Sequence, residues 1–151
     1  MDWSYVAGLF DGEGSVSFIA SKPPLRNAYT LNLRMSISAS YESTRLALQE
    51  FLEENGIGSF TFASNNPFGI SIRVTVIGWK NCEKFCNAML PYVIEKKRHL
   101  EIVSRILELH KISKIEGVGG ITNHLGEFDA FRHELHALAN KGTSLSKKWL
   151  K

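Results

Sequence analysis

Residues 6 to 14 read VAGLFDGEG, an apolar stretch that ends in two acidic residues set between glycines. Residues 3 to 11 lack proline, and their side chains recur at helical spacing on two faces. The apolar face consists of Val6, Leu9 and Phe10, and the small face consists of Ser4, Ala7, Gly8 and Asp11. A carboxylate at the C-terminal end of a helix faces the negative end of the helix dipole, which costs about 0.3–1 kcal/mol. The positions of Asp11 and Glu13 therefore call for a compensating partner.

After Gly14 the spacing changes from helical to alternating, which is typical of strands with one buried face. Val16 and Phe18 alternate with serines, and residues 31 to 40 alternate apolar with polar side chains. The same pattern returns at residues 60–62 and 70–76. The turn sequences SKPPLRN (21–27) and SNNPFG (64–69) separate the members of each pair. The sequence thus predicts two β-hairpins.

Helical spacing covers the remaining segments. We expect helices over residues 43–54, over about ten residues from Lys80 to near Pro91, and through YVIEKKRHLEIVSRILELHKI (92–112). The inner stripe of the long helix consists of Leu100, Val103, Ile106, Leu107 and His110. A last helix is expected over about 125–140, stopped at Gly142 and followed by a basic tail with Lys147, Lys148 and Lys151. The order αββαββα predicts an α+β fold with one four-stranded antiparallel sheet, covered by helices on its apolar face.

The polar positions of the predicted strands have an unusual composition. They are Ser15, Ser17, Asn32, Arg34, Ser36, Ser38, Ser40, Ser59, Thr61, Ser71, Arg73 and Thr75, with no carboxylate among them. A solvated sheet face normally mixes both signs of charge. Hydroxyls, amides and arginines without acids suit an anionic partner with hydrogen-bonding edges, such as nucleic acid, although an ordinary polar surface is the alternative.

The 151 residues, 44% of them hydrophobic, suit one compact domain over 1–151, and a net charge of +3 leaves the partner open. We expect an intracellular protein without a membrane partner, cytoplasmic in a prokaryote or organellar in a eukaryote, because no signal peptide or apolar run of about 18 residues is evident. Cys82 and Cys86 lack further ligands at zinc spacing and are interpreted as packed helix thiols. His133-Glu134-Leu135-His136 has the wrong histidine spacing for a zinc-protease motif.

VAGLFDGEG resembles the LAGLIDADG motif of homing endonucleases. Ala7, Gly8, Leu9, Asp11 and Gly14 match that motif, Val6, Phe10 and Glu13 are conservative replacements, and Gly12 is a commonly allowed one. The αββαββα order is similar to the family's core, and the resemblance thins beyond about residue 113. One motif copy implies the homodimeric type. The resemblance implies a sequence-specific double-strand DNA endonuclease that hydrolyses phosphodiester bonds in a long pseudo-palindromic site, with Mg²⁺ or another divalent metal, in intron homing.

The resemblance also implies roles for individual residues. Glu13 would bind the metal, with the backbone carbonyl of Gly12 as a second ligand, and Asp11 would support the helix end or the interface. Lys96 would act as the basic group at the site. A polar position near Ser40 or Tyr41 would orient water, with Arg45 one helical turn further on. The small face of Ser4, Ala7, Gly8 and Asp11 would form the dimer interface.

The sheet face would contact double-stranded DNA. The candidate residues are Ser15, Ser17, Arg26, Asn32, Arg34, Ser36, Ser38, Ser59, Thr61, Ser71, Arg73 and Thr75. No small-molecule substrate is expected. The alternatives are a non-catalytic relative that binds nucleic acid, as an intron RNA splicing maturase or a DNA-binding regulator, and a dimeric interaction domain that binds no nucleic acid.

Overall fold

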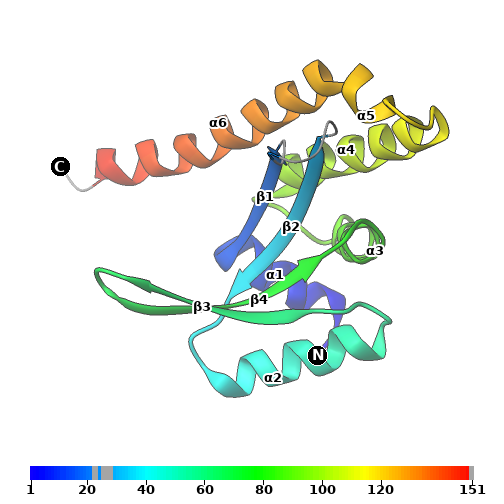
Figure 1. Ribbon diagram of the computed structural model, residues 1–151. Helices are drawn as coiled ribbons and strands as arrows, with labels where there is room; N and C mark the ends of the chain where they lie inside the picture. Colours follow the sequence, from blue (N-terminus) through cyan, green and yellow to red (C-terminus); the bar gives the residue numbers. More distant parts are fainter. Residues whose placement is uncertain (22–23, 25–28, 150–151) are drawn as a thin grey trace.

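The computed structural model describes residues 1–21, 24 and 29–149, with residues 140–149 as backbone. Its elements follow the predicted αββαββα order, and three further helices end the chain (Figure 1). They are α1 (Trp3–Glu13), β1 (Gly14–Ser21), β2 (Thr30–Ser38), α2 (Glu42–Glu54), β3 (Phe60–Asn66), β4 (Gly69–Ile77), α3 (Trp79–Met89), α4 (Lys97–Ile115), α5 (Gly120–Asn123) and α6 (Leu125–Trp149). The α+β prediction is confirmed.

The four strands form one antiparallel sheet in the order β1-β2-β4-β3. Helices α1, α2 and α3 pack on one face of the sheet, and α6 packs along the edge strand β1 (Figure 1). Phe10 of α1 and Phe85 of α3 are fully buried between these layers, with their rings 6.1 Å apart and nearly perpendicular. None of the helices in the described part of the chain combines the length and apolar composition needed to cross a membrane.

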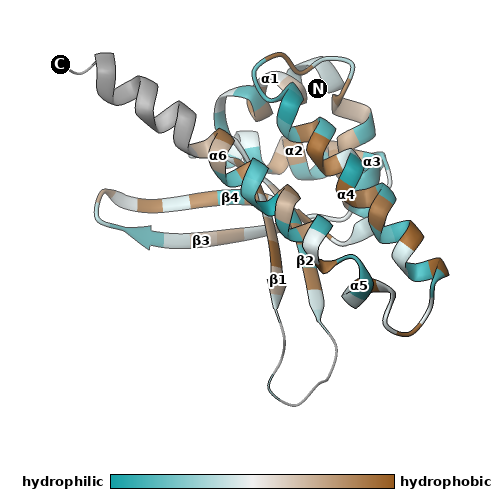
Figure 2. Ribbon diagram, turned by 90° about the horizontal axis from the view of Figure 1, so that it is seen from above, coloured by the Kyte–Doolittle hydropathy of each residue, from teal (hydrophilic) through white to brown (hydrophobic). Residues whose placement is uncertain are grey.

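The long helix starts later than its spacing predicted. Residues 92–96 are not helical, and α4 begins at Lys97. The reason is tertiary, because the backbone N–H groups of Ile94 and Lys96 donate to the carboxylate of Asp11 on α1. The predicted inner stripe of α4 is buried throughout, and apolar and polar segments alternate along this helix in Figure 2.

The end of the chain also differs from the prediction. The last helix begins near residue 125 as expected, but α6 continues through Gly142 to Trp149. Glycine lowers helix stability by about 1 kcal/mol without forbidding the conformation, so a single glycine was a weak stop signal. The short helix α5 was not predicted.

The strand register defines a polar face, which is the face turned away from the apolar core. Its members are Ser15, Ser17, Ile19 and Ser21 of β1, Thr30, Asn32, Arg34, Ser36 and Ser38 of β2, Ser71, Arg73, Thr75 and Ile77 of β4, and Phe60, Phe62, Ser64 and Asn66 of β3. These described residues include no carboxylate. The prediction that this face lacks carboxylates is therefore confirmed, but some of its members differ from those predicted.

The correction concerns β3. Phe60 pairs with Thr75 and Phe62 pairs with Arg73, so both phenylalanines lie on the polar face. Thr61 pairs with Val74 and lies on the opposite face, while Ser59 precedes the strand. All seven residues of β3 are exposed, so no burial forces its apolar side chains toward the helices. Alternation alone could not decide which of its two faces joins the core.

Two other candidates for DNA contact are buried. Ser36 is 8% exposed and Thr75 is 4% exposed, although both belong to the polar face. Their hydroxyl oxygens lie 2.9 Å apart and share a hydrogen bond across β2 and β4. The prediction that both hydroxyls are open to a ligand was therefore wrong, because each satisfies the other at the centre of the sheet.

Candidate functional site

The motif helix α1 is closed at both ends by local interactions. Asp2 precedes it, and the Asp2 carboxylate accepts from the backbone N–H of Tyr5 at 2.9 Å and from the Ser4 hydroxyl at 2.6 Å. At the other end the N–H of Gly14 donates to the carbonyl of Phe10. A Cβ at Gly14 would lie 2.4 Å from the Phe10 ring and from its carbonyl oxygen. The last glycine of the motif is thus required by the close passage of the chain from α1 into β1.

Asp11 joins the end of α1 to the start of α4. Its two carboxylate oxygens accept from the N–H of Ile94 at 2.8 Å and from the N–H of Lys96 at 3.0 Å. Lys96 is the N-cap of α4, where the helix dipole is positive, and a carboxylate is stabilised there. The partner that compensates Asp11 for its position at a helix C-terminus is therefore the amino end of another helix.

The side chain of Lys96 also connects the start of α4 to the end of α1. Its ammonium donates to the carbonyl oxygens of Phe10 at 3.0 Å and of Asp11 at 2.9 Å, and it lies 5.8 Å from the centre of the Phe10 ring. Burial lowers the pKa of Lys96, and the nearby carboxylates of Asp11, Glu13 and Glu95 act against that shift. The structure thus brings Lys96 and the acidic helix end together, as the resemblance implied.

Glu13 differs from Asp11 in its exposure and in its hydrogen-bond partners. It is the last residue of α1 and is exposed, as is Gly12. Its negative charge is one of those that oppose the lowering of the Lys96 pKa by burial. An exposed carboxylate beside a lysine can bind a cation or a phosphate-bound metal without disturbing the fold.

The small face of α1 is only partly available to a second chain. Ala7 is fully buried in the chain's own core, so the prediction that it forms an exposed interface was wrong. Ser4, Gly8 and Gly12 are exposed, and Tyr5 is 52% exposed beside them. A Cβ at Gly8 would meet no atom of this chain within 4 Å. The exposed stripe therefore runs through Gly8 and Gly12 rather than through Ala7.

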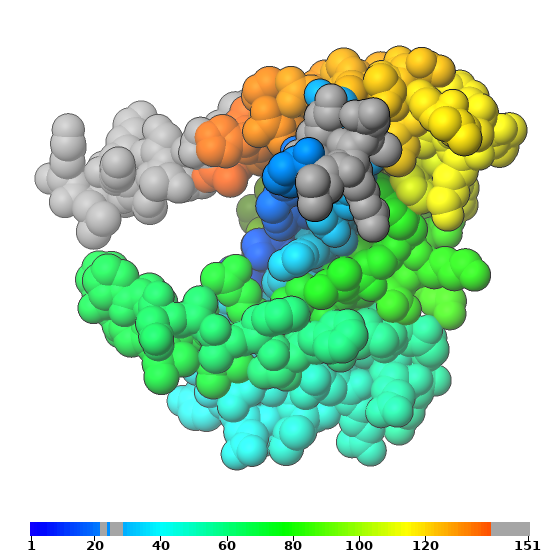
Figure 3. Space-filling view, in the orientation of Figure 1, coloured from blue at the N-terminus to red at the C-terminus, as the bar shows by residue number. Residues whose placement is uncertain are grey.

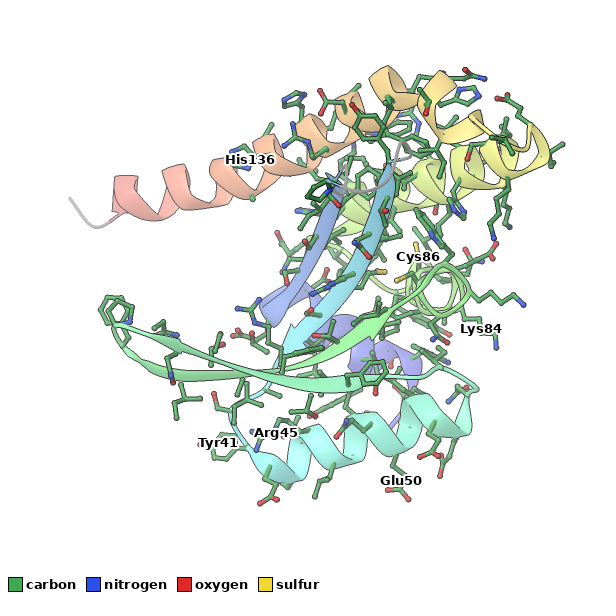
Figure 4. The ribbon with its side chains drawn as sticks, in the orientation of Figure 1. Tyr41, Arg45, Glu50, Lys84, Cys86 and His136 are labelled. Atoms are coloured by element: carbon green, nitrogen blue, oxygen red, sulfur yellow. The ribbon has the colours of Figure 1, made fainter. Side chains whose placement is uncertain are left out.

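The segment after β2 lies beside the end of α1, because Ile37 pairs with Gly14. Arg45 donates from Nη1 to the carbonyl oxygens of Ala39 at 2.9 Å and of Ser40 at 2.8 Å. These bonds join the first turn of α2 to the chain just after β2. Figure 4 shows Tyr41 and Arg45 together at the start of α2, and Tyr41 is 78% exposed. Ser40 is also exposed, so both candidates for the water-orienting position reach solvent.

The arginines of the polar face are exposed, as predicted. Arg34 pairs in register with Ser17 and Ile77, and Arg73 pairs with Ser38 and Phe62. Arg73 donates to the Ser64 hydroxyl at 3.5 Å, which keeps its guanidinium over the same face. Arg26, another candidate for DNA contact, lies outside the described residues. The polar face thus offers exposed positive charge and hydroxyl groups, apart from the buried pair Ser36 and Thr75.

The surface around this face is hollowed. Figure 3 shows a recess between α6 (orange) and the β3–β4 hairpin (green). A cleft of about 810 Å³ lies between β1 and α6 and includes Ser17 and Ile19 of the polar face, together with Arg132 and His136 of α6. Glu13 does not line this cleft. The acidic helix end is thus on an open surface, which suits a macromolecular ligand better than a small molecule.

The donor set at the end of α1 fits a divalent cation only together with further oxygen ligands. Among the described residues, no cluster of three or more histidine, cysteine, aspartate or glutamate side chains is arranged to hold a metal ion. The Asp11 carboxylate is already bound to two N–H groups, which leaves Glu13 and the carbonyl of Gly12 as hard oxygen donors of the motif. Mg²⁺ typically takes one or two carboxylates and completes its shell with water and substrate phosphates. Glu13 and Gly12 fit such a cation with a phosphate present.

No family model and no curated protein matches this sequence. Solved structures of homing endonucleases do share its fold. The homing endonuclease I-CvuI, solved in complex with the I-CreI target in the presence of Mg, aligns over 90% of this chain and 80% of its own, with a TM-score of 0.69 and 15% identity. The homing endonuclease I-TnaI aligns over 93% of this chain and 99% of its own, with a TM-score of 0.66 and 15% identity.

A larger protein shows the same likeness over part of its length. The LAGLIDADG homing endonuclease I-GzeII, solved in complex with its DNA target, aligns over 87% of this chain but 44% of its own, with a TM-score of 0.68 and 16% identity. This chain thus spans less than half of I-GzeII. The chain has the fold of LAGLIDADG homing endonucleases, with the motif at the end of α1 as the sequence indicated.

Proposed function

We propose that this chain is a homodimeric, metal-dependent DNA endonuclease of the LAGLIDADG type that cuts both strands of a long pseudo-palindromic site. The observation that carries the proposal is the division of the two motif acids. The Asp11 carboxylate accepts from two backbone N–H groups, whereas Glu13 is exposed and its charge acts on the half-buried ammonium of Lys96. A structural role accounts for the first acid and leaves the second for a ligand.

The acid-free polar face supports DNA as that ligand. Arg34 and Arg73 are exposed on it, and a two-stranded β-ribbon fits the major groove of a duplex. A strand of about seven residues at ~3.3 Å each spans about seven base-pair steps at ~3.4 Å. One sheet can therefore follow a long half-site, and two copies of the chain can follow a full site.

The residues at the helix end have separable tasks in hydrolysis. Glu13 and the Gly12 carbonyl would hold a divalent cation against a scissile phosphate, and the cation would supply charge stabilisation and a more acidic water. Lys96 carries a positive charge beside the same helix end and would face the charge that develops on the phosphate. Arg45 donates to the Ser40 carbonyl, and a polar side chain of residue 40 or 41 would orient the attacking water.

The composition of the site supports a dimer. One chain supplies one exposed motif carboxylate, and cleavage of two strands requires two such sites. Gly8 has open space above its Cα, and Gly12 lies one turn further along the same exposed stripe. Glycines allow two helix backbones to approach closely, which would bring the two Glu13 residues together at the dimer axis.

Cleavage selection tests the proposal directly. The purified chain is incubated with a randomised duplex library and Mg²⁺, and the cut ends are sequenced. We expect a pseudo-palindromic consensus, loss of cleavage in Glu13→Gln and unchanged cleavage in Glu50→Gln, an exposed glutamate on α2 (Figure 4). Salt-dependent duplex binding without cutting would indicate a non-catalytic regulator. Absence of duplex binding would contradict the proposal as a whole.

A further inference from the structure

Two phenylalanines interrupt the otherwise polar surface of the sheet. Phe60 is 57% exposed and Phe62 is 46% exposed, and the register places both on the polar face. Their ring centroids lie 6.5 Å apart, so they form one apolar patch rather than two isolated side chains. Folding does not require this patch, because all of β3 is exposed and its rings do not belong to the buried core.

The neighbours of the patch identify the kind of surface that it meets. Phe62 lies opposite Arg73, and Arg73 lies opposite Ser38 on the next strand. Phe60 lies opposite Thr75. The exposed Arg73 and the half-exposed Ser38 therefore lie beside the patch, whereas Thr75 is buried, and the polar face brings no carboxylate near the rings. An apolar patch in such a setting complements a surface that is negatively charged and carries apolar groups between hydrogen-bonding edges.

The major groove of DNA has that composition. Its edges present donors and acceptors from every base pair, and its apolar feature is the C5-methyl group of thymine. A phenyl ring forms no strong hydrogen bond, so its base discrimination in the groove comes from apolar contact with that methyl group. We propose that Phe60 and Phe62 are specificity-determining residues that select thymine at two positions of each half-site by contacting its C5-methyl group.

The spacing of the rings fixes the spacing of the two positions. Residues i and i+2 of a strand are about 6.6 Å apart along the strand, and the ring centroids are 6.5 Å apart. Two base-pair steps at ~3.4 Å cover about the same distance. The two methyl-dependent thymines therefore lie about two base pairs apart within a half-site. This inference rests on the proposed function, because it requires DNA on the polar face.

The test removes the methyl groups one at a time. The probe is the duplex chosen by cleavage selection, prepared as a series in which each thymine is replaced by deoxyuridine, which lacks the C5-methyl group. Binding is measured in EDTA, so that no cutting occurs. We expect two uracil positions per half-site, about two steps apart, to weaken wild-type binding about fourfold each, the effect of losing one buried methyl group. The other uracil positions should leave binding unchanged.

Variants assign each methyl group to a ring. Phe62→Ala should bind the unmodified duplex more weakly and should lose its sensitivity to one of the two uracil positions. Phe60→Ala should lose sensitivity to the other. Phe62→Leu keeps an apolar contact and should keep the sensitivity. Thr61→Ala is the matched control, because Thr61 lies between the two rings on the opposite face of β3. Circular dichroism checks that each variant is folded.

The outcomes separate the inference from the proposed function. A selected site without thymines about two steps apart, or wild-type binding that ignores every uracil, would overturn the assignment of the rings while DNA recognition stands. Uracil sensitivity that persists in both alanine variants would overturn it as well. If no duplex is selected or bound, the proposed function and the inference fall together. Loss of one uracil effect in each alanine variant supports the inference.

Discussion

The inward and outward sides of the last turn of α1 hold two carboxylates in opposite situations. On the inward side Asp11 accepts from the N–H groups of Ile94 and Lys96, and it fixes α1 to the start of α4. On the outward side Glu13 is exposed and is near the Lys96 ammonium. Two residues that look like a pair in the sequence thus differ in their surroundings, since one is bound to the start of α4 and the other is open to solvent.

This difference shows how an acidic helix end can be both stable and reactive. A carboxylate that accepts from backbone N–H groups on both oxygens is stabilised and has fewer lone pairs free for a cation, whereas one without such donors keeps all of them open to ligands. The motif needs both, because the inward acid holds the backbone that presents the outward one.

The largest difference should appear in cleavage. Glu13→Gln removes the charge that would hold the cation, and a metal contributes several kcal/mol to the transition state, so we expect the rate to fall about 10³-fold. Asp11→Asn should lower the rate less than about tenfold. Rates are measured at saturating enzyme on the selected duplex. Equal losses in the two variants would show that the acids act as one unit.

Acidification should destabilise the fold at a place remote from both acids. His110 is 6% exposed and stacks on Trp79 with ring centroids 3.5 Å apart. Burial, and secondarily Lys114, lowers the pKa of His110 to about 4 from an ordinary 6.5. The unfolded chain therefore takes up the proton first, so stability present above about pH 6.5 is lost as the pH falls toward 4. We expect a loss of about 2 kcal/mol between pH 7 and 5 in urea unfolding.

The pH effect has internal controls. His99, whose pKa is lowered by burial and by Lys96, adds to the loss, while His124, whose pKa is raised by Glu127 and Glu116, opposes it. Asp11→Asn and Glu13→Gln should show the same fall with pH as the wild type. A His110→Gln variant with an undiminished fall would show that another group is responsible.

The two hydrogen bonds from Ile94 and Lys96 to Asp11 should raise the free energy of unfolding at neutral pH. Asp11→Asn replaces a charged acceptor of two N–H bonds with a neutral amide, and we expect the free energy of unfolding to drop by about 1–2 kcal/mol. Glu13→Gln, its outward counterpart, should change it by less than about 0.5 kcal/mol. Urea unfolding at pH 7.5 measures both. A larger loss in Glu13→Gln than in Asp11→Asn would reverse the division of roles.

The smallest effect compares two glycines of the same motif. A Cβ at Gly8 meets nothing within 4 Å, so Gly8→Ala should stabilise the separate chain by about 0.5–1 kcal/mol through better helix propensity. Gly14→Ala should instead cost about 1 kcal/mol or more, because its Cβ would overlap Phe10. Sedimentation adds the second readout, since Gly8→Leu should weaken a dimer that packs on this stripe. An undisturbed dimer in Gly8→Leu would place the interface elsewhere.

The sequence predicted the strands well wherever burial forces the pattern. Leu33, Met35 and Ile37 of β2 and Val74 and Val76 of β4 are all nearly fully buried, and their polar neighbours face away. The alternating pattern predicted the wrong face at β3. All residues of this strand are exposed, and Phe60 and Phe62 lie on the polar face. Helix ends were least predictable, because the start of α4 is fixed by an acid 83 and 85 residues away in the chain.

The site could be predicted in part. Position in the motif separated Glu13 from Asp11, and the resemblance placed Lys96 beside them, where the structure has it. Burial of Ala7 was not readable, because a small residue on a helix suits the chain's own core as well as a second chain. The mutual pairing of Ser36 and Thr75 was equally hidden, since it depends on the register of β2 against β4.

The β3–β4 hairpin reaches away from the helices in Figure 1, and no residue of β3 is buried. A side chain that supports no core can be replaced at little cost to folding, since surface substitutions usually change stability by less than about 0.5 kcal/mol. The outer half of this hairpin is therefore where the chain tolerates the most sequence change. Under the proposed function, single substitutions in this hairpin could change the DNA sequence that is bound, by natural drift or in a directed library. The acidic helix end and its hydrogen bonds to the start of α4 would stay unchanged.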